Sequence, residues 1–156
     1  MRRRVIAGVI GLLLATVVAG PASASTGEPD MDPQVAAVMA EVPGGVLIDS
    51  HHAIWPGLDM ELVVPRSSGA MARSAVGPCA DGYVCVYANT SPGGAFLRWT
   101  TCGYHAIPAT FVARSVADAR ATGSVQARSG TSVLASAPAG GWASIPIKPD
   151  NVLCFF

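Results

Sequence analysis

The stretch that decides the fold runs from residue 79 to residue 115 and reads CADGYVCVYANTSPGGAFLRWTTCGYHAIPATFVARS. Residues 83–87 (YVCVY) alternate β-branched and aromatic side chains, which is typical of a half-buried strand. Residues 89–94 (NTSPGG) favour a turn, because asparagine and glycine tolerate positive φ and proline fixes its own φ. Residues 95–100 (AFLRWT) predict a second strand, so the two strands form a hairpin.

The spacing within this stretch is more specific than a hairpin alone. Tyr87 ends the first strand, Gly94 follows seven residues later, and Ser115 lies twenty-one residues beyond the glycine. This spacing resembles the Greek-key signature of the βγ-crystallins. In that signature the glycine lets the folded hairpin lie back over the sheet, and the serine hydroxyl ties it down from a later strand. Pro92 departs from the signature, which usually has an aromatic residue at this position.

Residues 77–87 (GPCADGYVCVY) contain two cysteines and restrict the resemblance to a smaller group of proteins. Residues 78–156 resemble the secreted metalloproteinase inhibitors of actinobacteria, which are small βγ-crystallin-like peptidase inhibitors. Strand-like runs separated by glycine turns continue beyond Ser115 and predict a second, shorter Greek key. The resemblance implies a mostly β, βγ-crystallin-like Greek-key β-sandwich that blocks a secreted metalloproteinase by inserting a loop into its cleft. A non-inhibitory extracellular structural or surface-binding module is the alternative from a different functional class.

The first 24 residues have the parts of a secretory signal peptide. Three arginines at positions 2–4 precede an apolar run over residues 5–20, and Ala22-Ser23-Ala24 matches a cleavage pattern of small residues. We therefore expect secretion with cleavage after Ala24, and no membrane association of the mature chain. The full sequence carries 10 basic and 10 acidic residues, so loss of the three arginines leaves 7 bases against 10 acids, a net charge of −3.

The four cysteines all follow the expected cleavage site, at Cys79, Cys85, Cys102 and Cys154. An even number of cysteines in an exported chain predicts two disulfides. Three pairings are possible, and we favour one bridge within residues 79–102 and one that tethers Cys154. The sequence contains no Cys-x2-Cys pair, which disfavours a structural zinc site.

Residues 25–77 form a leading segment before the inhibitor-like domain at residues 78–156. A short helix is predicted over about residues 33–42, because an Asp-Pro pair suits its start and its valines share one face. Short strands are predicted from there to residue 65, and residues 66–77 are small and polar, as in a linker.

Charge differs between these two parts of the chain. Residues 25–65 carry seven acidic side chains and no lysine or arginine, whereas residues 79–156 carry five basic and three acidic ones. Opposite charges would favour docking of one part on the other, although exposed ion pairs contribute only about 0–1 kcal/mol each. Two independent solvated surfaces fit the same charges. A docked segment would also be able to cover the domain until cleavage near residues 66–73 removed it.

Catalytic chemistry has little support in the sequence. Gly-x-Ser-x-Gly, His-Glu-x-x-His and phosphate-binding glycine motifs do not occur. His51 and His52 are adjacent, so in a strand they point to opposite faces and suit no shared metal ion. At the loop where βγ-crystallin motifs bind calcium, Phe111 and Arg114 stand in place of oxygen ligands. We expect no enzyme activity, cofactor or metal, and the net charge disfavours nucleic acid.

Recognition by a disulfide-stapled β domain, expected to be a monomer, is the remaining function. A rigid loop loses little conformational entropy when it enters a protease cleft, and disulfides provide such rigidity. Residues 88–94 and residues 103–110 are the candidate loops. The second is bounded by a cysteine and contains a proline, so we expect its side chains Tyr104, His105 and Ile107 to contact a metalloproteinase.

Overall fold

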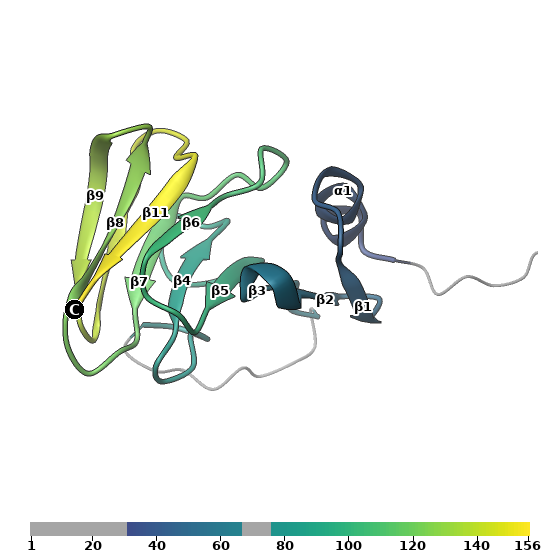
Figure 1. Ribbon diagram of the computed structural model, residues 1–156, viewed down its shortest axis with the longest axis horizontal. Coiled ribbons are helices and arrows are strands. Elements are labelled where there is room, and N and C mark those ends of the chain that lie inside the picture. Colours follow the sequence, from purple (N-terminus) through teal and green to yellow (C-terminus); the bar gives the residue numbers. More distant parts are fainter. Residues whose placement is uncertain (1–30, 67–75) are drawn as a thin grey trace, which may run out of the picture.

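The computed structural model describes residues 31–66 and 76–156 (Figure 1). The expected signal peptide and most of the predicted linker lie outside the described residues. Within them the fold consists of two antiparallel sheets and one short α-helix, which confirms the mostly β fold predicted from the sequence.

The helices are α1 (Pro33–Glu41) and a short 3-10 helix, η1 (Pro56–Leu58). The strands are, in chain order, β1 (Val46–Asp49), β2 (His52–Trp55), β3 (Met60–Val63), β4 (Val84–Tyr87), β5 (Phe96–Trp99), β6 (Tyr104–Ala106), β7 (Ser115–Asp118), β8 (Ser124–Ser129), β9 (Ser132–Pro138), β10 (Gly141–Ser144) and β11 (Asn151–Phe155).

Helix α1 begins at the predicted Asp-Pro pair. The Asp32 side chain accepts a hydrogen bond from the backbone N–H of Gln34 at 2.8 Å, which caps the first turn. Val35 and Val38 are fully buried and belong to the same core cluster as Trp55 of β2. A nine-residue helix is not stable alone in water, so this packing holds it in place.

The β domain has two halves, β4 to β7 and β8 to β11, and each half contributes one strand to the sheet that holds most of the other half. The larger sheet has the order β1-β2-β3-β5-β4-β7-β10, and the smaller sheet has the order β6-β11-β8-β9. In the first half, β6 leaves β4, β5 and β7 to pair with β11. In the second half, β10 leaves β8, β9 and β11 to pair with β7. Each sheet is thus completed by a strand from the other half.

The larger sheet is buried on both faces where β4 and β5 cross its centre. Leu97 and Trp99 face the main core between the sheets. Phe96 and Tyr87 pack on the opposite face, with ring centroids 5.7 Å apart. Residues 76–83 cover this second face, and the Tyr87 hydroxyl donates a hydrogen bond to the Val76 carbonyl at 2.6 Å.

The loop of the β4–β5 hairpin and the loop of the β8–β9 hairpin are each hydrogen-bonded to the first residue of a later strand, β7 and β11 respectively. Gly94 has φ +72°, which residues with a Cβ rarely adopt. The Ser115 hydroxyl, at the start of β7, donates to the Asn89 carbonyl at 2.9 Å. Asn151, at the start of β11, makes the corresponding contact, because its amide donates to the Gly130 carbonyl at 3.1 Å.

The acidic leading segment shares the larger sheet with the rest of the chain. Strand β3 pairs with β5 from Met60↔Trp99 to Val63↔Phe96. Across this junction the Glu61 carboxylate accepts hydrogen bonds from both Nε and Nη2 of Arg98. Of the two interpretations of the charge difference, the structure shows docking.

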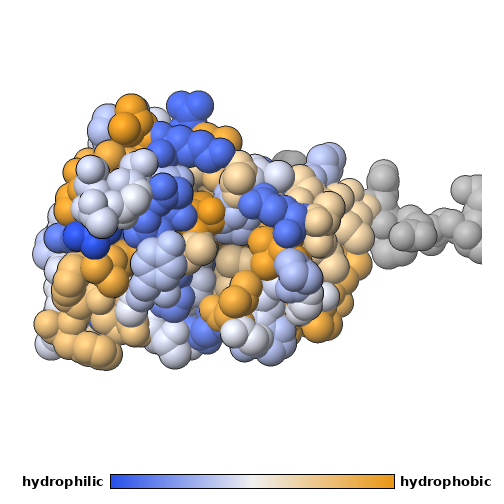
Figure 2. Space-filling model, turned by 45° about the horizontal axis from the view of Figure 1, so that its top comes forward, coloured by the Kyte–Doolittle hydropathy of each residue, from blue (hydrophilic) through white to orange (hydrophobic). Residues whose placement is uncertain are grey.

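Both predicted disulfides are present. They join Cys79 to Cys85 and Cys102 to Cys154, which is one of the three pairings that the sequence left open. Two disulfides suit an oxidising compartment. Within residues 31–66 and 76–156, no helix is long and apolar enough to cross a membrane. On the face shown in Figure 2, hydrophobic and hydrophilic residues are interspersed.

Candidate functional site

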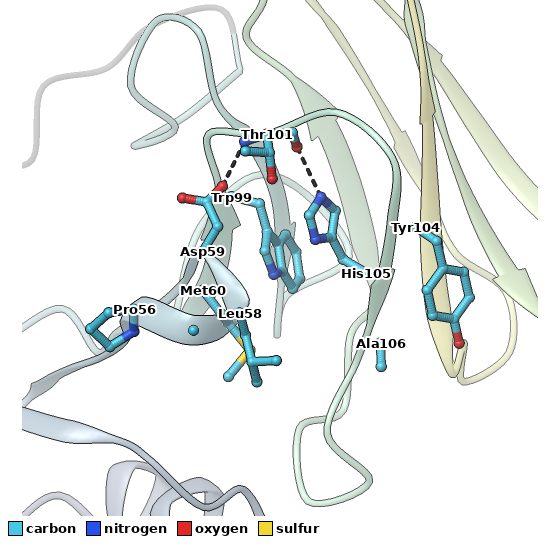
Figure 3. Close-up of a pocket in the computed structure, with 10 residues that line it drawn as sticks. Pro56, Leu58, Asp59, Met60, Trp99, Thr101, Tyr104, His105 and Ala106 are labelled. Carbon is cyan, nitrogen blue, oxygen red and sulfur yellow. Dashed lines mark hydrogen bonds between the residues drawn. The ribbon is translucent and has the colours of Figure 1, made fainter.

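A hollow of about 490 Å³ opens between η1 and β6, beside the end of β5 (Figure 3). Met60 and Trp99 line it and are buried, so they give it an apolar floor. Leu58 and Tyr104 stand on opposite sides of it with 51% and 65% of their surface exposed. The hollow therefore combines an apolar interior with one exposed apolar side chain, Leu58, at its rim.

Strand β6 is held firmly on the side that faces the core. The His105 ring stacks on the Trp99 ring, with centroids 5.2 Å apart. His105 Nε2 lies 2.8 Å from the Thr101 carbonyl, so this nitrogen carries the proton and donates. The disulfide at Cys102 precedes the strand, and Ile107 is buried directly after it. These contacts fix the strand on both sides of its exposed residues.

Helix α1 holds the loop that follows β6. The Glu41 carboxylate accepts hydrogen bonds from the backbone N–H groups of Ala109 and Thr110 and from the Thr110 hydroxyl. The Thr110 hydrogen bond is the main reason why the pKa of Glu41 lies below its ordinary value. The leading segment thus braces the candidate site as well as extending the sheet.

The outer edge of β6 has no strand beside it among the described residues. Its inner edge pairs with β11, where Gly103 O accepts from Cys154 N and Ile107 N donates to Asp150 O. Hydrogen-bonding positions alternate along an edge strand. Since residues 103, 105 and 107 face β11, the backbone N–H and C=O groups of Tyr104 and Ala106 point to the open side.

The carboxylate of Asp59 is fully used in fixing η1 against β5. Its Oδ2 accepts from the backbone N–H groups of Thr100 and Thr101 at 2.8 and 2.6 Å, and its Oδ1 accepts from the Thr100 hydroxyl at 2.6 Å. Partial burial acts to raise the pKa of Asp59, but these hydrogen bonds outweigh it and lower the pKa. Asp59 therefore shapes the hollow and keeps its negative charge beside it.

The structure separates the three predicted contact residues. Tyr104 is exposed, His105 is half-buried against Trp99, and Ile107 is only 5% exposed and lies in the main core. The burial of Ile107 leaves it little surface for the predicted contact with a partner. Side chains alternate between the faces of a strand, so Ile107 follows His105 toward the core, while Tyr104 lies on the other face of β6 (Figure 3).

Comparisons with known proteins add no family assignment. No protein-family model matches the chain, and neither the curated proteins nor the solved structures gave a match.

Sequence reasoning missed the wall of the hollow that the leading segment provides. Leu58, Asp59 and Met60 reach the site only because β3 pairs with β5. Pro56 and Gly57 favour a turn here, but nothing in the sequence indicates which strand lies beside that turn.

The other predicted loop, residues 88–94, suits a contact role less well. Asn89 is tied through its carbonyl to Ser115, and Gly94 lies close to the Asn89 side chain. No large hydrophobic side chain in this loop is exposed. It therefore lacks the exposed aromatic anchor that β6 has.

A second polar cluster lies on the other face of the sheet and is structural. His52 Nε2 lies 2.6 Å from Glu61 Oε1, and the Arg98 guanidinium lies 4.7 Å from the centroid of the Tyr83 ring. Arg98 already occupies both oxygens of Glu61. Among the described residues, no group of three or more His, Cys, Asp or Glu side chains is placed to hold a metal ion.

Proposed function

We propose that this protein inhibits a secreted metalloproteinase by placing β6 in the cleft of the protease. The observation that carries the proposal is that β6 is both exposed and braced. Tyr104 is 65% exposed, although it lies between the disulfide at Cys102 and the buried Ile107. A braced strand loses little conformational freedom on binding, and exposed tyrosines are common binding anchors.

The proposal includes a βγ-crystallin-like Greek-key fold for residues 78–156 and membership of the secreted inhibitor family that the sequence resembles. Strand β7 returns beside β4, and β11 returns beside β8, as the fourth strand of a Greek key does. The positive φ of Gly94 and the hydroxyl contact of Ser115 agree with the signature. Secretion with cleavage after Ala24 is part of the same proposal, and the disulfides support an oxidising compartment.

The leading segment is, on this proposal, a part of the inhibitor and not a removable cover. Strand β3 pairs with β5, Leu58 forms one side of the hollow, and Glu41 holds the loop after β6. Removal of this segment would take away one side of the candidate site and leave the edge of β5 unpaired.

An inhibition assay tests the proposal. Purified mature protein, residues 25–156, is titrated against thermolysin and other secreted thermolysin-like enzymes. We expect saturable inhibition at or below micromolar concentration, with no enzyme activity of the protein itself. Tyr104→Ala should weaken inhibition at least about tenfold, or about 1.4 kcal/mol. The control is Val133→Ala, an exposed residue on β9 at the opposite edge of the same sheet.

Two results would overturn the proposal. Absence of inhibition by the wild-type protein at micromolar concentration would leave the non-inhibitory surface-binding module as the better interpretation. Equal inhibition by the wild type and Tyr104→Ala would show that another surface contacts the protease.

A further inference from the structure

A free strand edge and an apolar hollow meet at β6. We propose that an extended segment of a partner protein pairs with the outer edge of β6 and places one apolar side chain in the hollow. This inference deepens the proposed function, since it gives the chemistry of the partner at the same site. It does not require the partner to be a protease.

The strand edge provides the first half of the surface. The backbone groups of Tyr104 and Ala106 point away from β11 and have no strand to pair with in the described part of the chain. Edge strands that avoid pairing are very short or carry lysine, proline or a bulge. With three residues, β6 offers an edge for a short segment only. The sequence of β6, Tyr-His-Ala, has neither lysine nor proline, and its pairing with β11 is regular. An extended peptide is the ligand that such an edge binds.

The hollow provides the second half and favours an apolar side chain over an acidic one. Its floor is formed by Met60 and Trp99. The carboxylate of Asp59 and the ring nitrogen of His105 are already hydrogen-bonded to the turn after β5. No lysine or arginine lines the hollow to pair with an acidic occupant, the Asp59 carboxylate would repel one, and an unpaired buried charge is strongly unfavourable. At about 490 Å³ the hollow has the size of a small-ligand pocket and admits a bulky side chain.

The alternation of side chains along a strand defines the pattern that the partner needs. His105 points from β6 toward Trp99, on the side of the hollow, whereas Tyr104 points away (Figure 3). A partner residue on the His105 side of the extended sheet would enter between Leu58 and β6. Its two neighbours would lie on the Tyr104 side. The partner segment is therefore an extended strand with one apolar residue between neighbours that face outward.

A peptide titration without any protease tests this inference. Isotope-labelled mature protein, residues 25–156, is titrated with acetyl-Thr-Val-Leu-Val-Thr-amide and, separately, with the same peptide carrying aspartate in place of leucine. We expect saturable nuclear magnetic resonance shifts at the amides of Tyr104 and Ala106 and at the Trp99 indole with the leucine peptide. The aspartate peptide should bind at least tenfold more weakly. No shift at millimolar leucine peptide, equal binding of both peptides, or shifts that map elsewhere would overturn the proposal.

Two variants address the two halves of the surface separately. Ala106→Pro removes an outward N–H while leaving the β11 hydrogen bonds in place, and Leu58→Asp puts a charge at the rim. Each should weaken binding of the leucine peptide at least tenfold, whereas Val133→Ala should not change it. Leu58 is 51% exposed, so Leu58→Asp remains informative if the proline variant does not fold. Binding that survives both variants contradicts the proposal. Peptide binding without protease inhibition would refute the proposed function but would support the peptide-binding surface at β6.

Discussion

Gly94 is the residue on which the first hairpin loop depends. Its φ of +72° lies in the left-handed region, and a Cβ built there would lie 3.0 Å from the side-chain atoms of Asn89. The Asn89 carbonyl in turn accepts the hydrogen bond from Ser115. A side chain at position 94 would therefore strain the backbone and displace the contact that ties the loop to β7.

Gly94→Ala should lower the free energy of unfolding by more than about 1 kcal/mol, because a non-glycine residue with positive φ is strained. Gly140→Ala is the matched control, since Gly140 has φ +70° and no atom within 4 Å of a built Cβ. Urea unfolding of both variants separates backbone strain from crowding of Asn89. Equal losses in the two variants would contradict a special role for the loop at Gly94.

At the scale of elements, the disulfide Cys102–Cys154 joins the start of β6 to β11. Arg120 Nη1 donates to Cys102 Sγ at 2.8 Å, and Cys102 is half-buried. The other bridge is more enclosed, since Cys79 and Cys85 are 2% and 0% exposed. A guanidinium beside a sulfur stabilises the thiolate that forms when the bridge opens.

Dithiothreitol should therefore open Cys102–Cys154 before Cys79–Cys85. Alkylation at timed intervals followed by peptide mass analysis measures the order. Arg120→Gln should slow the opening of Cys102–Cys154, because the departing thiolate loses its positive neighbour. Faster opening of Cys79–Cys85 in the wild type would refute this role of Arg120.

The junction between β3 and β5 also predicts a dependence on pH. Burial acts to raise the pKa of Glu61, but the hydrogen bonds and charge of Arg98, with His52, outweigh it and hold the pKa below its ordinary value of 4.5. A carboxyl group whose pKa is lower in the folded state stabilises the fold above its unfolded pKa. That stabilisation is lost as the pH falls through the folded pKa, so it disappears on acidification below about pH 4.5.

Glu61→Gln should cost about 2 kcal/mol at pH 7, the order expected for hydrogen bonds to a charged group. Its unfolding free energy should fall less than that of the wild type between pH 5 and about pH 3. The exposed Asp81 has no partner in the described structure, so Asp81→Asn serves as the control. Parallel stability curves for Glu61→Gln and the wild type would show that the Glu61–Arg98 pair does not link the two segments.

At the scale of the whole molecule, local signals predicted more than long-range ones. The Asp32 cap, the turn at residues 89–94 and the strand alternation of residues 83–87 each act within a few residues, and the structure has the corresponding helix, turn and strand. The strand is buried on both faces, however, and not half-buried as its alternation predicted. The pairing of β3 with β5 joins residues almost forty positions apart. Only this pairing brings Leu58 near Tyr104, so the hollow had no local signal in the sequence.

The misplacement of Ile107 has a related cause. The segment Tyr-His-Ala-Ile has no clear alternation of polar and apolar residues, so its sequence does not show which set of side chains faces the core. The hydrogen bonds to β11 and the stacking of His105 on Trp99 decide that question. The pairing with β11 joins residues almost fifty positions apart, so the local sequence does not indicate it.

Amide hydrogen exchange of the mature protein, alone and with a metalloproteinase that it inhibits, tests most directly whether β6 is the contact surface. In the free protein the outward N–H groups of Tyr104 and Ala106 should exchange rapidly, because they pair with no strand. In the complex we predict slowed exchange at these two amides and across residues 57–60, with no change in residues 88–94. Slowed exchange centred on residues 88–94, with Tyr104 and Ala106 exchanging as in the free protein, would contradict the account.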